Sequence, residues 1–250
     1  MHLYLIRHAQ SANNYAYAVG GERQPDPPLT ALGHRQARAL AAHLAQRPGG
    51  PRSLYAERQD RGGFTLTHLY SSLMLRAVTT AAYVAEATGL PLHAWPDIHE
   101  IGGLHGIAPE TGEVIGVAGP GRAYFAAEHP YLVLPDALAE TGWWNRDKER
   151  RDEYVPRAEA VWRDLLARHS GDDCVALITH AGFFRFLFRV LVGADAADPS
   201  SLGLTGWWLG MNNAAISHIE ISEGESEGEK WAAVHYINKV EHLTDDLLSY

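Results

Sequence analysis

Arg7 and His8 stand where an apolar run near the start of the chain gives way to polar residues. The run, residues 3–6, is too short for a stable helix and is typical of a buried strand in a parallel sheet. Open α/β sheets bind ligands at the carboxyl ends of their strands, where these two side chains would lie. A neutral imidazole there can attack phosphorus while a permanently charged guanidinium holds the phosphoryl oxygens. The pair is also compatible with an ordinary strand end, because short motifs occur by chance.

The same arrangement recurs late in the chain. The apolar run 174–178 is followed by Thr179, His180, Ala181 and Gly182, and a largely apolar, buried helix is expected over 183–191. Arg76 is a third candidate, because it falls in the first turn of a helix expected to follow a short strand at 68–70 and to end at Gly89. A helix N-terminus attracts anions, although an isolated arginine is more often simply solvated.

Strands and helices alternate along most of the chain. Thr30 is the expected N-cap of a helix that ends before Pro48. We also expect a strand at 91–95, a helix at 156–169 and a terminal hairpin of strands at 214–221 and 231–237. Loops are expected at 12–28, at 55–65 and through Pro199 and Gly206. Residues 97–152 break the rhythm and predict an inserted lobe with short helices, including one at 122–129. The pattern predicts a single α/β domain over 1–250 that carries this lobe.

Composition narrows the class of protein. Of the 250 residues, 46% are hydrophobic and 20% charged, as in ordinary globular proteins. The formal charge of −9 and the lack of a Lys/Arg cluster argue against nucleic-acid binding. The one cysteine, Cys174, opens an apolar run and is expected to be a buried hydrophobe in a reducing compartment. No apolar run reaches the roughly 18 residues that span a bilayer, and no signal peptide is evident, so we expect a cytoplasmic protein with no membrane contact.

Several short motifs in register point to one family. The chain resembles the histidine phosphatase superfamily, with the phosphoglycerate mutase-like fold, in RHAQS at 7–11 followed by Asn14, PLTALGHRQA at 28–37, YSSLMLRAVTTA at 70–81, HEIGGLHG at 99–106, THAG at 179–182 and NNAAIS at 212–217. The resemblance implies a three-layer α/β/α fold. Its central sheet would be mostly parallel, and the lobe would cover the carboxyl edge of that sheet.

The resemblance also implies roles. His8 would be the nucleophile that forms a phosphohistidine, and Arg7, Arg76 and His180 would line the phosphate pocket, with Asn14 as a neutral donor and Ser11 as a further phosphate-binding candidate. His8 must attack as a neutral imidazole, whereas His180 is useful when a bound phosphate favours its protonated form.

Glu100 is the candidate proton donor to the leaving group, because a nearby phosphate dianion raises the pKa of a carboxyl group. Glu110 and Glu113 are alternatives. The cluster of His99, Glu100 and His105 admits a zinc interpretation, but its spacing does not place two ligands on one helical face. No metal or cofactor is therefore expected in catalysis.

Departures from the family pattern narrow the range of expected substrates and reactions. Ala9 and Ala181 replace the usual glycines, which is conservative. Ile101 stands where cofactor-dependent mutases carry an arginine, and Arg122 is the only fixed cation between residues 95 and 145. These features favour a phosphatase acting on a small phosphomonoester over a phosphoglycerate mutase. A non-catalytic module that binds phosphorylated ligands is the alternative outside enzymes.

Two further questions are left open by the sequence. The lobe aromatics Trp143, Trp144, Tyr124 and Phe125 are expected to be core rather than a substrate wall. A strand at the edge of the sheet, from the terminal hairpin, leaves a homodimer possible.

Overall fold

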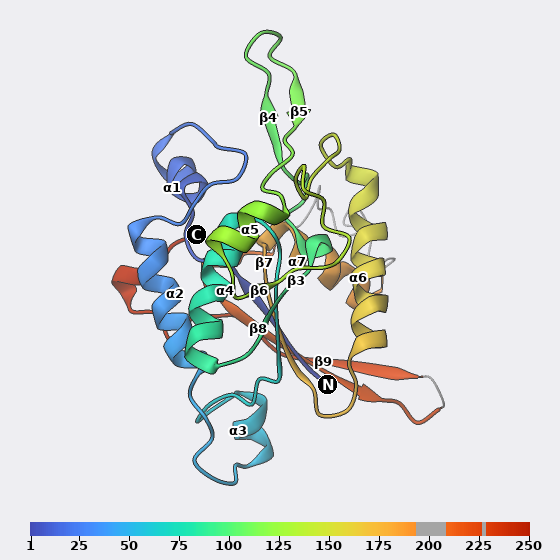
Figure 1. Cartoon of the computed structure of the whole chain (residues 1–250). Coiled ribbons are helices and arrows are strands. Elements are labelled where there is room, and N and C mark those ends of the chain that lie inside the picture. Colours follow the sequence, from blue (N-terminus) through green and yellow to red (C-terminus); the bar gives the residue numbers. More distant parts are fainter. Residues whose placement is uncertain (194–208, 227–228) are drawn as a thin grey trace, which may run out of the picture.

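A seven-stranded sheet forms the centre of the computed structural model, which describes residues 1–193, 209–226 and 229–250 (Figure 1). The loop expected through Pro199 and Gly206 lies outside these residues. The strand order is β6-β3-β2-β7-β1-β8-β9. The strands are β1 (His2–Arg7), β2 (His68–Ser71), β3 (Leu92–Ala94), β6 (Leu132–Val133), β7 (Cys174–Thr179), β8 (Ile216–Glu223) and β9 (Lys230–Lys239).

The direction of the strands confirms the predicted mixed, mostly parallel sheet. Neighbours from β6 through β3, β2 and β7 to β1 are parallel, and the terminal hairpin adds β8 antiparallel to β1 and β9 antiparallel to β8. β9 forms one edge of this sheet. Pairing of two copies through that edge remains a prediction.

Helices cover both faces of the sheet, as predicted for a three-layer fold (Figure 1). The helices on the two faces are α2 (Ala31–Leu44), α4 (Leu75–Thr88), α6 (Tyr154–Arg168) and α7 (Ala181–Leu191). Side chains of β1 alternate between the layers: Tyr4 and Ile6 pack in the core beneath α2 and α4, whereas Leu3 and Leu5 pack in the core beneath α6 and α7. Because both faces of the central strands β1 and β7 are covered, these two strands read as continuous apolar runs.

Local signals set the helix ends where they were predicted. The Thr30 hydroxyl accepts a hydrogen bond from Gly33 N–H at 3.0 Å and begins α2. Gly89 adopts the left-handed conformation and ends α4. Among the described residues, none of the helices combines the length and the apolar character needed to cross a bilayer.

Two segments expected as loops contain short helices. Within 12–28 the chain forms α1 (Ala12–Val19), because Ser11 and Asn14 build a capping box at its start. Within 55–65 lies part of α3 (Leu54–Arg58), which is capped by Ser53. Both were missed because these exposed helices bury almost nothing: Ala16 is the only buried residue of α1, and α3 buries none. They therefore carry no apolar periodicity in the sequence.

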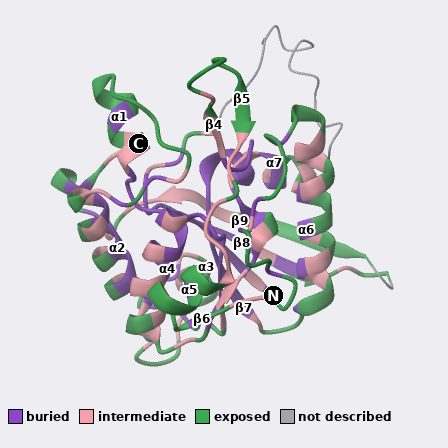
Figure 2. Ribbon diagram, turned by 45° about the horizontal axis from the view of Figure 1, so that its top comes forward, coloured by how far each residue is buried: buried purple, intermediate pink, exposed green. Residues whose placement is uncertain are grey.

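The segment 97–152 is more ordered than expected and is not wholly separate from the sheet. It contains the predicted helix as α5 (Arg122–Glu128), but β6 joins the central sheet beside β3. The remaining elements are β4 (His105–Ile107), β5 (Val114–Gly116) and the short helices η1 (Pro96–Ile98), which begins just before the segment, and η2 (Arg151–Glu153), which ends just beyond it. β4 and β5 form a hairpin that projects beyond the sheet on the same side as α1 (Figure 1), with an exposed tip (Figure 2).

A buried ion pair ties the start of this segment to α6. Arg157 donates from Nε and Nη2 to the Glu149 carboxylate at 2.6 and 2.9 Å, and from Nη1 to the His99 carbonyl at 3.0 Å. Glu149 also accepts a hydrogen bond from Gly102 N–H at 3.1 Å. These contacts fix the backbone on both sides of Glu100.

Candidate active site

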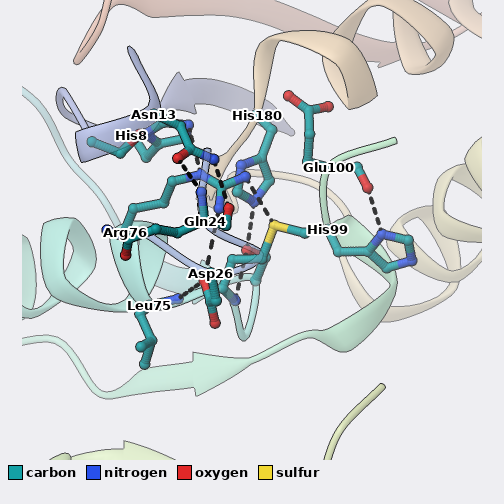
Figure 3. A network of polar contacts seen from close by, with 12 residues as sticks. His8, Asn13, Gln24, Asp26, Leu75, Arg76, His99, Glu100 and His180 are labelled. Carbon is teal, nitrogen blue, oxygen red and sulfur yellow. Dashed lines mark hydrogen bonds and ion pairs between the residues drawn. The ribbon is translucent and has the colours of Figure 1, made fainter. Parts of the chain in front are cut away.

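The four basic residues predicted from the sequence meet at the carboxyl edge of the sheet, and Figure 3 shows three of them, His8, Arg76 and His180. Arg7 and Thr179 are register partners on the adjacent parallel strands β1 and β7, so His8 and His180 emerge side by side. Their ring centroids lie 5.0 Å apart. Arg76 reaches the same place from the first turn of α4. All four side chains are buried, with His180 wholly inaccessible to solvent.

The hydrogen bonds of His8 define its tautomer. Its Nδ1 lies 2.7 Å from the Ala9 carbonyl oxygen, which can only accept, so Nδ1 carries the proton. The lone pair is therefore on Nε2, which accepts a hydrogen bond from Arg76 Nε at 3.1 Å. A neutral imidazole with its lone pair beside a guanidinium is the form required of a nucleophile for phosphorus.

His180 is held by Ser72 at the end of β2. Its Nε2 lies 2.7 Å from Ser72 Oγ, and its Nδ1 is buried with no partner among the described residues. Ser72 Oγ accepts from Met74 N–H at 3.4 Å, which leaves its own proton free to point at His180 Nε2. In that arrangement His180 carries its proton on Nδ1, as an unused donor.

The two guanidiniums are held by neutral and acidic groups. Arg7 donates from Nη1 to the Met211 carbonyl and stacks on the Tyr250 ring, 5.3 Å from its centroid, while its buried Nε has no partner among the described residues. Arg76 donates from Nη2 to Met74 Sδ at 3.1 Å. Burial lowers the pKa of both arginines, and the negative charge of Glu100 acts against this shift.

Burial and positive charge keep both histidines neutral. Burial lowers the pKa of His8 well below its usual range, and Arg76 and Arg7 lower it further. Burial and Arg76 do the same for His180. The neutral state expected of His8 is thus a consequence of its surroundings, whereas a protonated His180 would require the charge of a bound phosphate.

Asn14 and Ser11 lie near His8, to which Asn213 connects them, but their side chains have different partners. Asn14 Oδ1 accepts from Ser11 Oγ at 2.8 Å and from Asn213 Nδ2 at 3.3 Å, so its amide Nδ2 is the group left to donate. The Ser11 hydroxyl is engaged in this cap of α1. Asn213 also donates to the His8 carbonyl at 3.3 Å, and it belongs to the motif NNAAIS.

The Glu100 carboxylate sits on the N-terminus of α7, and its charge acts on both arginines. It accepts hydrogen bonds from the N–H groups of Ile101 at 2.8 Å, Phe183 at 3.0 Å and Gly182 at 3.3 Å. A Cβ at Gly182 would lie 2.3 Å from Glu100 Oε1, so this close approach requires glycine. The alternatives Glu110 and Glu113 are exposed in the turn between β4 and β5.

Asp26 is a site residue that sequence reasoning missed. Its Oδ1 accepts from Leu75 N–H at 3.0 Å and lies 3.7 Å from Arg76 Nη1, and its Oδ2 is buried with no partner among the described residues. Burial raises the pKa of Asp26 to about 6, although Arg76 and the Leu75 N–H act in the opposite direction. Its loop is fastened to α1 by two hydrogen bonds between Asn13 and Gln24 (Figure 3). The available signal was an aspartate directly before Pro27 and Pro28.

The residues considered for zinc and for an aromatic wall have structural partners. His99 and His105 direct Nδ1 to the carbonyls of Glu100 and Gly103, at 2.8 and 3.3 Å. Of the lobe aromatics, Phe125 and Trp144 are buried in the core as expected. Trp143 is partly buried against that core, and Tyr124 is exposed.

Solved structures share this fold at low sequence identity. The native mycobacterial glucosyl-3-phosphoglycerate phosphatase superposes with a TM-score of 0.57 at 20% identity, covering 96% of this chain and 99% of that one. The alpha-ribazole phosphatase of Shigella flexneri gives a TM-score of 0.56 at 20% identity and covers 96% of each chain.

Sequence comparison identifies the family. The probable phosphoglycerate mutase GpmB of Yersinia pestis (strain Pestoides F) is 33% identical over 101 residues, which are 40% of this chain and 38% of that relative. The model of the histidine phosphatase superfamily (branch 1) matches residues 3–113 and 121–234. That match takes in the segments that carry Arg7, His8, Arg76, Glu100 and His180, and the chain belongs to the histidine phosphatase superfamily, branch 1.

Proposed function

We propose that this protein hydrolyses small phosphomonoesters through a phosphohistidine on His8. The observation that carries the proposal is the His8 Nε2 lone pair, buried and 3.1 Å from Arg76 Nε, with the Arg7 side chain close enough to affect its charge. A group that only bound phosphate would gain nothing from a lone pair, because phosphate oxygens need donors.

The reaction consists of two displacements at phosphorus. His8 Nε2 attacks in line, a P–N bond forms, the bond from phosphorus to the ester oxygen breaks, and Glu100 gives its proton to the departing alkoxide. Glu100 then takes a proton from water, whose oxygen attacks the phosphohistidine and releases inorganic phosphate, and His8 returns to its neutral state.

The other residues hold the transferring group. Arg7, Arg76 and His180 supply positive charge and N–H donors to its oxygens, and the Asn14 amide supplies a neutral donor. Ser11 positions Asn14 rather than binding phosphate, since its hydroxyl is engaged in the cap of α1. These donors are fixed before the substrate binds, which is how a protein lowers the barrier of phosphoryl transfer.

Hydrolysis is favoured over mutase activity because Arg122, the one arginine or lysine of residues 95–145, is engaged elsewhere and not available for a second anionic group. Arg122 binds the carbonyls of Pro135, Asp136 and Leu138 and so supports the lobe. Two structures of similar fold carry the names glucosyl-3-phosphoglycerate phosphatase and alpha-ribazole phosphatase. Two observations support the mutase alternative. One is the partial match to GpmB, and the other is exposed Arg23, whose positive charge lowers the pKa of Arg76.

A direct test offers 3-phosphoglycerate, sugar phosphates and p-nitrophenyl phosphate to the wild type and to His8→Ala. We expect release of inorganic phosphate in the wild type and a loss of roughly 10³-fold or more in the variant. Formation of 2-phosphoglycerate faster than phosphate release would establish the mutase instead. Equal, negligible turnover in both proteins, with retained phosphate binding, would establish a binding module.

The role of Glu100 predicts a dependence on the leaving group. Glu100→Gln keeps an acceptor for the α7 N–H groups but cannot donate a proton. We expect kcat/KM to fall roughly 10²-fold or more for alkyl phosphates, whose alkoxides need that proton, and much less for p-nitrophenyl phosphate. The measurement is the ratio of the two kcat/KM values in wild type and variant. An unchanged ratio would remove Glu100 from the role of acid.

Asp26 is proposed to position Arg76 by its charge. Because its pKa lies near 6, the carboxylate is ionised above that pH and loses its hold on Arg76 below it. Asp26→Asn should therefore lower kcat/KM roughly 10-fold at pH 7.5, and the ratio of wild type to variant should approach one as the pH falls through 6. Ionisation of the substrate cancels in this ratio.

Thermal unfolding separates this role from a structural one. Since folding raises the pKa of Asp26, its ionised form costs stability at pH 7.5, and Asp26→Asn should unfold at the same or a higher temperature than the wild type. Glu22→Gln, an exposed acid in the same loop, is the matched control and should change neither quantity. If the ratio of kcat/KM between the wild type and Asp26→Asn did not vary with pH, the proposed role of Asp26 would be contradicted.

A further inference from the structure

Three side chains with metal-binding atoms converge at the amino edge of the sheet, away from His8. His68 is the first residue of β2, His169 follows the end of α6, and Asp173 directly precedes β7. One ligand atom from each lies within 4.8 Å of the others. Within the described ranges this is the only group of three such residues found to converge in this way, whereas the other buried histidine contacts with acids, such as His235 with Glu220, have two members.

The separations suit a small cation. His169 Nδ1 lies 3.2 Å from Asp173 Oδ2, and His68 Nδ1 lies 3.9 Å from Asp173 Oδ1. Tetrahedral Zn²⁺ with bonds near 2.0–2.2 Å places its ligand atoms about 3.3–3.5 Å apart. Small side-chain rotations of His68 and Asp173 would therefore close the site, and both side chains are more than 30% exposed and free to make them.

The surrounding residues orient the ligands as outer partners of a metal site do. Without a metal, His169 Nδ1 donates to Asp173 Oδ2, which can only accept. Its Nε2 lies 3.1 Å from the Tyr70 hydroxyl, which can accept a hydrogen bond once a metal takes the place of the proton on Nδ1. The Thr67 hydroxyl lies 2.8 Å from His68 Nδ1, but it also has the backbone of Cys174 as donor and acceptor at 2.9 and 3.2 Å. If His68 turned to bind a metal, the Thr67 hydroxyl would keep its two hydrogen bonds to the Cys174 backbone.

The three side chains differ in exposure. The His169 side chain is 2% exposed and held in place, whereas those of His68 and Asp173 are 38% and 31% exposed. The site therefore has one fixed ligand and an open path for an ion.

We propose that His68, His169 and Asp173 bind one divalent transition-metal ion, for which Zn²⁺ is the best match, with water as the remaining ligand. Imidazole and carboxylate ligands suit Zn²⁺ among the common ions, and three protein ligands leave one open position. The ion would join the start of β2 to the turn between α6 and β7. Since this edge is opposite the phosphate pocket, the ion stabilises the fold and takes no part in phosphoryl transfer.

The test is a titration of the chelator-treated full chain with Zn²⁺, followed by calorimetry and thermal unfolding, and with Co²⁺, followed by its visible spectrum. We expect one saturable site per chain, a tetrahedral Co²⁺ spectrum, and a rise of roughly 5 to 10 °C in Tm at about 100-fold excess over the Kd. His68→Ala and Asp173→Asn should abolish the spectrum and the rise.

His235→Ala is the matched control, because it removes another histidine paired with a carboxylate, and it should bind Zn²⁺ as the wild type does. His68 and Asp173 are partly exposed, so their variants are expected to fold, and circular dichroism without metal checks this. The proposal is overturned if the wild type shows no saturable site, or if the site survives in both His68→Ala and Asp173→Asn. Neither outcome bears on the phosphatase proposal, which depends on the opposite edge of the sheet.

Discussion

Two guanidiniums buried beside two imidazoles set the main physical constraint on this protein. Charge removed from water is costly unless it is paired, and here Arg7 and Arg76 are both largely inaccessible. The protein meets this cost with Asp26 and Glu100, and by keeping His8 and His180 neutral. The result is a buried cluster with unused N–H donors and excess positive charge, for which a phosphate dianion is a chemical complement. The same surroundings keep the His8 imidazole neutral, with a lone pair on Nε2.

The parallel sheet makes this concentration of charge possible. Adjacent strands β1 and β7 end in register, so residues far apart in the chain emerge together, and the N-termini of α4 and α7 point to the same edge. The segment that carries Glu100 is held against α6 by the pair of Arg157 and Glu149, and Gly182 lets its carboxylate reach the α7 backbone. The Glu100 carboxylate is therefore placed by contacts from three separate parts of the chain.

Much of this was predictable because it depends on patterns a few residues long. Apolar runs predict the buried strands, Thr30 and Gly89 mark helix ends, and the rule that parallel strands share a carboxyl edge brings Arg7, His8 and His180 together. What the sequence did not reveal depends on contacts between distant residues. Nothing in the local pattern shows that Asp26 contacts Arg76.

The missed secondary structure has the same origin. α1 is built on side-chain caps rather than on a buried face, so an apolar period could not predict it. The strands of the β4–β5 hairpin are three residues each, which is too short for alternation to be recognised. The cluster of His68, His169 and Asp173 likewise joins two segments that are adjacent only in the folded sheet.

The most direct test of the central claim is to trap the phosphoryl group on the protein. Glu100→Gln, mixed with p-nitrophenyl phosphate, should form the phosphohistidine normally but hydrolyse it slowly, because the base for water is missing. Quenching in alkaline detergent and peptide mass spectrometry should then find one phosphoryl group on His8, stable in alkali and lost in acid. Sustained phosphate release with the phosphoryl group on another residue, or with none on His8, would contradict the account.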